Sequence, residues 1–310
     1  MDLVTLQDVQ AAAGRIAGIA WRTPLMPFGE DFWLKPESLQ PIGAFKIRGA
    51  ANAIGALSPS AVITHSSGNH GRALAFVASR KGIPATVVMP DTSPQVKIDA
   101  IAELGAEVVM VSPADRLVVA EKLAAEKGAT LIPPFDHPAV IAGQGTIGLE
   151  ILEDLPELPE ADVIIVPVGG GGLISGIAAA VKALRPATRI IGVEPELAGE
   201  AKESLQRDRL ITWPTEQTYR TVADGVRTAP SALTFAHMRE YVDDIITVDD
   251  DEILKAVRVL ALSAKLVVEP SGAIAVAAYL YRRGFLPGGR TAAVISGGNV
   301  DPSLLRSCLT

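Results

Sequence analysis

The chain has 310 residues, a formal net charge of −7 and 48% hydrophobic residues. This length allows two lobes, the composition excludes a disordered chain, and the acidic balance without a basic cluster excludes a nucleic-acid-binding surface. A single cysteine, Cys308, excludes an intrachain disulfide. The start of the sequence lacks a signal-peptide pattern and no apolar run is long enough to span a bilayer. We therefore expect a cytoplasmic protein without membrane contact.

Short β-branched runs alternate with alanine-rich helical segments along the chain. In chain order, strands are predicted at residues 61–65, 85–89, 107–111, 129–132, 163–168, 189–194 and 291–295. Helices are predicted at residues 70–81, 95–104, 115–127, 173–185 and 251–265, and a helical run begins directly behind Lys46. The alternation indicates βαβ units, and the continuously apolar strands indicate parallel sheets covered on both faces. The charged run 241–253 is interpreted as a solvated loop and a helix start.

Two proline-rich stretches interrupt this alternation. Residues 131–138 are interpreted as a crossing between lobes, and residues 155–162 as a loop within the larger lobe. We therefore assign residues 1–52 and 138–310 to a large domain and residues 53–137 to a small domain.

The strongest local signal is the run of four glycines from Gly169 to Gly172, between a predicted strand and a predicted helix. Glycines let the backbone approach an anion closely, and the amides at a helix start bind phosphate. A competing interpretation is a dinucleotide site, because Gly170, Gly172 and Gly176 resemble that fingerprint and Glu194 ends the next strand.

A second polar loop connects a strand to a helix at residues 66–70. It contains hydroxyl groups, a side-chain amide and backbone amides at the helix start, from Ser66, Ser67, Gly68, Asn69 and His70. This combination suits a carboxylate, and Ser67 or Asn69 is also suited to a ring hydroxyl. The alternative is an ordinary helix cap with extra polar residues.

Two weaker signals follow. Ser296 ends a predicted strand, where ligands bind in α/β proteins, although a plain turn explains it equally well. The carboxylates of Glu194 and Glu200, with the carbonyl of Ala198, suit Mg²⁺ or Ca²⁺. Solvated acids around a proline turn are the alternative.

Lys46 stands among small and apolar neighbours, with Gly43 and Ala44 leaving room for a ring. Either it is a solvated residue at a helix start, or its amine does covalent chemistry. Pyridoxal phosphate needs a lysine, a phosphate site, a partner for its ring nitrogen and a nearby carboxylate site. This cofactor explains Lys46 and the three loops together, whereas a nicotinamide dinucleotide leaves Lys46 unexplained.

Eight motifs occur in order between about residues 20 and 302: GAFKIRGA, SSGNHG, AGQGT, PVGGGGLISGI, VEP, ADGV, VEPSGA and SGGN. Together they resemble the fold-type II pyridoxal-phosphate enzymes, specifically the serine racemase and serine/threonine dehydratase branch. The resemblance implies an α/β fold like that of tryptophan synthase β, with two lobes that each hold a mostly parallel sheet flanked by helices. It also implies a homodimer or homotetramer.

The resemblance implies a role for each matching residue. Lys46 would bind the cofactor covalently with Phe45 beside the ring, Asn69 would contact the ring hydroxyl, and Ser296 would face the ring nitrogen. The phosphate would be held by Gly169, Gly170, Gly171, Gly172 and Leu173. The substrate carboxylate would be held by Ser66, Ser67, Gly68, Asn69 and His70. The metal positions of racemase-like members match Glu194, Ala198 and Glu200, although those members more often carry aspartate where this chain has Glu200.

The implied activity is that of a pyridoxal-phosphate-dependent lyase. It would convert a β-hydroxy amino acid such as L-serine, L-threonine or L-threo-3-hydroxyaspartate to a 2-keto acid and ammonia. Ser67 is a second expected catalytic residue, because in racemase-like members it returns a proton on the opposite ring face. It therefore leaves serine racemase activity open. The alternatives are a β-replacement enzyme similar to cysteine synthase and a nicotinamide-dependent oxidoreductase.

Overall fold

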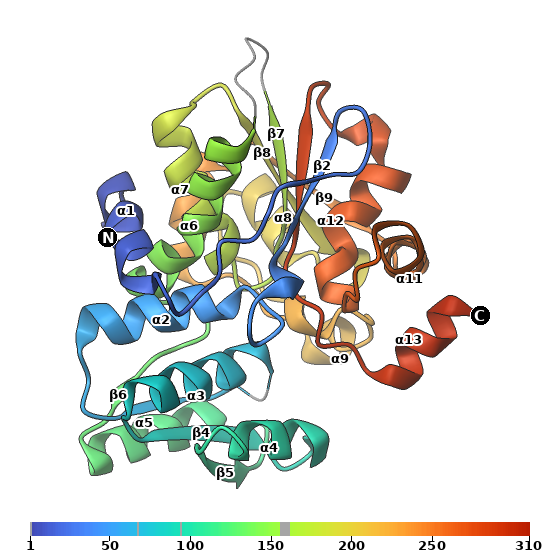
Figure 1. Cartoon of the computed structure of the whole chain (residues 1–310). Helices are drawn as coiled ribbons and strands as arrows, with labels where there is room; N and C mark the ends of the chain where they lie inside the picture. The colour runs from blue at the N-terminus through green and yellow to red at the C-terminus, as the bar shows by residue number, and fades with distance from the viewer. Residues whose placement is uncertain (1, 67, 94, 156–161) are drawn as a thin grey trace.

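Two sheets organise the chain, whose computed structural model describes residues 2–66, 68–93, 95–155 and 162–310 (Figure 1). The larger sheet has the order β1-β2-β10-β7-β8-β9, with strands Met26–Pro27, Phe32–Pro36, Thr291–Ile295, Val163–Pro167, Arg189–Pro195 and Asp244–Val248. The smaller sheet has the order β5-β4-β3-β6, with strands Glu107–Val111, Ala85–Pro90, Val62–Thr64 and Thr130–Leu131. Among the described strands, β1 and β2 pair antiparallel and every other pair is parallel.

Helices cover both sheets. The α-helices are α1 Leu6–Ile16, α2 Lys46–Leu57, α3 Asn69–Lys81, α4 Gln95–Ala102, α5 Arg116–Lys127, α6 Pro138–Asp154, α7 Gly172–Leu184, α8 Glu200–Gln206, α9 Thr215–Thr218, α10 Ala232–Tyr241, α11 Asp250–Val259, α12 Pro270–Tyr281 and α13 Pro302–Leu309. We call the smaller sheet with α3, α4 and α5 the small lobe, and the larger sheet with its helices the large lobe (Figure 1).

The two faces of the larger sheet pack against different helices. Along β7, Val163 and Ile165 join the core that includes α12, whereas Ile164 and Val166 join the core that includes α7. Alternate residues of a strand point to opposite faces, so both faces are apolar and the strand reads as a continuous apolar run. This arrangement confirms the predicted α/β fold with mostly parallel sheets.

Each of the seven predicted strands overlaps an observed strand, but β1, β2 and β9 were not among the predictions. The interpretation of residues 241–253 as a solvated loop is wrong for their middle part, since Asp244–Val248 forms β9 at the sheet edge, parallel to β8. Ile245, Ile246 and Val248 are buried there despite the flanking acids. The predicted helix 251–265 is also shorter, because α11 ends at Val259 and a π-helical turn follows at Leu260–Ala264.

All strands of the smaller sheet lie between residues 62 and 131, inside the range assigned to the small domain. The exact division at residues 53 and 138 stays a prediction. Within the described part of the chain, no helix has the length and apolar character needed to cross a membrane. The loops that follow β3, β7 and β10 all leave the carboxyl ends of parallel strands, where α/β proteins bind ligands.

Candidate active site

The segment before Lys46 is joined to the segment after β10. The Phe45 amide donates to the Ser296 carbonyl at 3.0 Å, the Gly298 amide donates to the Gly43 carbonyl at 2.8 Å, and Ala44 forms an antiparallel bridge with Gly297. These contacts bring Lys46, the first residue of α2, close to Ser296, which follows the central strand β10. Ser296 is 5% exposed and its hydroxyl donates to the Ser271 carbonyl at 3.3 Å.

The amine of Lys46 lies beside Pro134 and the ring of Phe45. Its Nζ donates to the Pro134 carbonyl at 2.8 Å and lies 4.9 Å from the centre of the Phe45 ring. Burial lowers the pKa of Lys46 from 10.5 to about 8. A larger fraction of this amine is therefore neutral near physiological pH than of a solvated lysine, which suits a nucleophile.

The glycine loop lies against the same 134–135 segment. Gly169, Gly170 and Gly171 connect β7 to α7, and Gly172 is the first residue of α7. A methyl group added at Gly170 would lie 2.4 Å from the Phe135 ring, so a side chain has no room there. The φ angle of +85° at Gly171 also favours glycine. The first amides of α7, including that of Leu173, have no intrahelical partner and provide donors for an anion.

His70 is held as a neutral ring. It is 1% exposed, and its Nε2 lies 3.0 Å from the Ile132 carbonyl. Burial and the charge of Lys46 lower the pKa of His70 to about 3. A neutral ring facing a carbonyl must carry its proton on Nε2, so Nδ1 is an acceptor and offers a carboxylate no donor. The donors available to a carboxylate here are the backbone amides at the start of α3, with the hydroxyl of Ser66. Ser67 lies outside the described residues.

Asn69 takes part in contacts between the lobes. Its side-chain Nδ2 donates to Glu269 Oε1 at 2.7 Å, and its Oδ1 accepts from Asn299 Nδ2 at 2.7 Å. Sequence reasoning missed Glu269 and Asn299 as site residues, although both stand in the motifs VEPSGA and SGGN. No pattern in the residues around Glu269 indicates its contact with Asn69, which is 200 residues away.

The predicted metal residues meet beside β8. Glu194 is 1% exposed, and its two oxygens accept from the amides of Ala201 at 2.9 Å and Lys202 at 2.8 Å. Burial, with the nearby charge of Glu200, raises the pKa of Glu194 to about 8, and burial also raises the pKa of Glu200. Ala198 is fully buried in the connecting turn. Burial disfavours the charged form of both carboxylates, and their role as metal ligands stays a prediction.

The same contacts make Glu194 unsuitable for a ribose. Both of its carboxylate oxygens already hold the first turn of α8, and the side chain is buried. The dinucleotide interpretation, which needed Glu194 free to face a ligand at Gly170, therefore has no support from the geometry.

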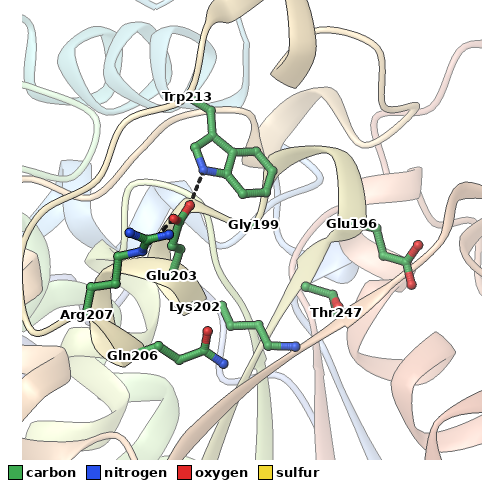
Figure 2. A pocket seen from close by; sticks show the side chains of 8 residues that line it. All are labelled: Glu196, Gly199, Lys202, Glu203, Gln206, Arg207, Trp213 and Thr247. Carbon is green, nitrogen blue, oxygen red and sulfur yellow. Dashed lines mark hydrogen bonds and ion pairs between the residues drawn. The ribbon is translucent and has the colours of Figure 1, made fainter.

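A cavity of about 360 Å³ lies next to the predicted metal residues, and Lys46 is not among the residues that line it (Figure 2). Figure 2 shows the Trp213 indole donating to Glu203 at 2.6 Å, while Arg207 forms a 2.7 Å ion pair with Glu203. Lys202 and Thr247 line another part of it. Of its lining residues, Gly199 lies between the predicted ligands Ala198 and Glu200, and Lys202 lies in the first turn of α8.

A buried ionic cluster, formed by Lys35, Glu37, Arg48 and Glu150, stands behind α2. Arg48 pairs with both oxygens of Glu37, at 2.7 and 2.8 Å, and with both oxygens of Glu150, at 2.6 and 2.8 Å. Lys35 adds a 2.6 Å ion pair to Glu150. Burial alone would raise the pKa of Glu37, but Arg48 holds it below its usual value. The cluster fixes the helix that begins with Lys46 to β2 and α6.

The comparisons with known proteins agree with this geometry. The chain is 41% identical to L-threo-3-hydroxyaspartate ammonia-lyase of Saccharomyces cerevisiae, over 97% of this chain and 95% of that protein. Its structure superposes on the threonine deaminase of T.th. with a TM-score of 0.90 at 44% identity, covering 96% and 99% of the two chains. It superposes on maize serine racemase with a TM-score of 0.91 at 38% identity, covering 99% and 97%.

These likenesses confirm the fold-type II architecture and exclude the nicotinamide interpretation. The family model described as "Pyridoxal-phosphate dependent enzyme" matches residues 16–297, which include Lys46, the glycine loop and Ser296. The chain belongs to the family of pyridoxal-phosphate-dependent enzymes.

Proposed function

We propose that this enzyme is a dehydratase, or ammonia-lyase, that converts a β-hydroxy amino acid to a 2-keto acid and ammonia. The observation that carries the proposal is the pairing of Gly43–Phe45 with Ser296–Gly298, which brings a lysine amine of lowered pKa and a strand-end serine together. The relatives named for L-threo-3-hydroxyaspartate, threonine and serine support L-serine, L-threonine and L-threo-3-hydroxyaspartate as substrates.

The residues of the site fit pyridoxal phosphate. Lys46 would be the amine for its aldehyde carbon with Phe45 beside it, the amides from Gly169 to Leu173 would hold the phosphate, and Ser296 would face the ring nitrogen. Asn69 keeps one side-chain N–H for the ring hydroxyl after donating the other to Glu269. When bound, the cofactor supplies an electron sink that makes removal of a proton from Cα feasible.

The chain's own groups then bind the substrate and move its protons. The amides at the start of α3, with the Ser66 hydroxyl, orient the carboxylate, while the neutral His70 ring contributes no charge. The Lys46 amine accepts the Cα proton and passes a proton to the β-hydroxyl, which leaves as water. The enamine that is released adds water and loses ammonia, which gives the 2-keto acid and balances the reaction.

Borohydride trapping tests the covalent assignment. The purified protein is expected to be yellow, and reduction should fix the cofactor to Lys46, as peptide mass spectrometry would show. Lys46→Ala should lose both the visible band and turnover. Lys122→Ala, which changes a lysine that is 71% exposed, is the matched control and should keep both. A colourless protein that takes up no pyridoxal phosphate would overturn the proposal.

A substrate panel tests the reaction. L-serine, L-threonine and L-threo-3-hydroxyaspartate are incubated with the holoenzyme, and 2-keto acid and D-amino acid are measured together. Failure to form keto acid from any of them would refute the dehydratase assignment. We also propose that Ser67 serves racemisation, so Ser67→Ala should lose D-serine formation and retain elimination. Equal loss of both products would assign Ser67 to substrate binding.

Three further properties are proposed. We infer that a divalent cation binds Glu194, Glu200 and the Ala198 carbonyl, supported by the burial of both carboxylates. We also propose that the enzyme is a homodimer or homotetramer. Light scattering of the purified holoenzyme tests the assembly. A cytoplasmic location stays an expectation, in keeping with the single cysteine.

A further inference from the structure

A chain of hydrogen bonds crosses the junction between the lobes. Arg72 and Asn69 belong to α3 in the small lobe, whereas Glu269 precedes α12 and Asn299 follows β10 in the large lobe. Arg72 donates to Asn299 Oδ1 at 2.8 Å, Asn299 Nδ2 donates to Asn69 Oδ1 at 2.7 Å, and Asn69 Nδ2 donates to Glu269 Oε1 at 2.7 Å.

The residues at the two ends of this hydrogen-bond series, Arg72 and Glu269, fix the orientation of both side-chain amides. A guanidinium only donates and a carboxylate only accepts, so Arg72 and Glu269 impose one direction on the amides between them. Asn299 Nδ2 also donates to the Ile42 carbonyl at 2.9 Å, which fixes Asn299 independently of Arg72. With both contacts made, Asn69 offers one N–H as its remaining donor. A flipped Asn69 would place an oxygen there instead.

Glu269 is built into this position. It occupies the N-cap of α12, but its side chain does not cap that helix and reaches Asn69 instead. It is 7% exposed, and a methyl group added at Gly297 would lie 2.1 Å from its Oε1, so the glycine makes room for the carboxyl group. Gly43, with φ +75°, makes room for Asn299 in the same way, since an added methyl would lie 2.6 Å from Asn299 Oδ1.

Few charged side chains act on the carboxyl group of Glu269. Burial and the charge of Asp224 raise its pKa to about 7, while the Asn69 hydrogen bond and Lys97 act in the opposite direction. Among the described residues, none of the ion pairs within 4 Å includes Glu269. A buried carboxyl group without an ion pair costs stability, and in this structure its contact is with a residue of the cofactor site.

We propose that Glu269 is a positioning residue, which holds the Asn69 carboxamide so that its free N–H points to the ring hydroxyl of the cofactor. This inference rests on the proposed role of Asn69 in the cofactor site. It also links the site to the lobe junction, because Glu269 and Asn69 lie on opposite sides of that junction.

A double-mutant cycle on the holoenzyme tests the inference. We expect Glu269→Ala to weaken pyridoxal phosphate binding about tenfold, the size of one lost hydrogen bond, and to shift the visible absorbance band. Asn69→Ala should do the same or more, and adding Glu269→Ala to Asn69→Ala should change nothing further. A full additional effect in the Asn69→Ala background, or a wild-type spectrum and affinity for Glu269→Ala, would overturn the proposal.

Three variants separate positioning from general damage. Glu269→Gln keeps an acceptor oxygen and should bind the cofactor within about threefold of wild type. If Glu269→Ala does not fold, Gly297→Ala displaces the carboxyl group sterically and replaces it in the cycle. Lys122→Ala changes a 71% exposed lysine on α5, in the same lobe as Asn69, and should leave the spectrum unchanged. The same spectral shift in Lys122→Ala would overturn a specific role of Glu269.

The apoenzyme separates failure of this inference from failure of the proposed function. The same cycle, measured by urea unfolding without cofactor, should show coupling between Asn69 and Glu269, because their contact exists in the protein alone. If Asn69 and Glu269 are coupled but the protein takes up no pyridoxal phosphate, the proposed function is refuted and the contact between the two residues is confirmed. Normal cofactor uptake without coupling would refute the role of Glu269.

Discussion

Replacing Arg48 by methionine would leave Glu37 as a buried carboxylate without its ion-pair partner. Both side chains are fully buried, and Arg48 supplies two of the hydrogen bonds to the Glu37 carboxylate. The donors that would remain are Thr23 at 2.6 Å and Gln40 at 3.0 Å. Breaking a buried ion pair by removing one partner costs about 3–5 kcal/mol. We therefore expect Arg48→Met to lower the free energy of unfolding by about that amount.

Urea unfolding of the purified protein measures this loss. The exposed pair Lys122–Glu126 is the matched control, and Lys122→Met should cost less than about 1 kcal/mol. Adding Glu37→Leu to Arg48→Met removes the unpaired charge. The free energy of unfolding of the double variant should therefore be about 3 kcal/mol higher than the sum of the two single losses predicts. A cost for Arg48→Met as small as that of the control, or strict additivity, would refute the reasoning.

Three further outcomes are expected. The rate at which the apoenzyme binds pyridoxal phosphate should rise with pH, because the neutral amine of Lys46 is the reactive form. The midpoint should lie near 8 and not at the ordinary lysine pKa of 10.5, because burial favours the neutral amine. Stopped-flow absorbance measures this rate. Gly170→Ala should weaken cofactor binding and destabilise the protein by about 1–3 kcal/mol through overpacking, whereas Gly14→Ala, which meets nothing within 4 Å, should do neither. Mg²⁺ or Ca²⁺ at about 100 times its dissociation constant should stabilise the protein by about 2.7 kcal/mol in thermal unfolding. Glu200→Ala should lose this stabilisation, and Glu203→Ala should keep it.

Much of the fold could be predicted because the central strands are continuous apolar runs bounded by glycine or proline. The strands that were missed lack this pattern. In β2, Phe32–Pro36, a lysine and a proline interrupt the apolar residues, and in β9 the acids on either side outweigh Ile245 and Ile246 in the local pattern. Their burial comes from neighbouring strands, β10 and β8, that are distant in sequence.

The residues of the site fall into the same two groups, those that local sequence patterns indicate and those that they do not. Lys46, the glycine loop and Ser296 stand at the ends of helices and strands, so local rules find them. Glu269 contacts Asn69, which is 200 residues away, and nothing in the residues around Glu269 indicates that contact. The members of the buried ionic cluster are likewise charged residues that the sequence alone would place at the surface.

The pairing of Gly43–Phe45 with Ser296–Gly298 has a consequence for biosynthesis. The ribosome makes the segment around Ala44 first, and its partner segment around Gly297 follows about 250 residues later. The strands of the small lobe, all made before residue 132, can pair while synthesis continues, since domains generally fold as units from the N-terminal side. The cofactor site, in contrast, cannot be completed on the nascent chain until residues 296–298 have been translated.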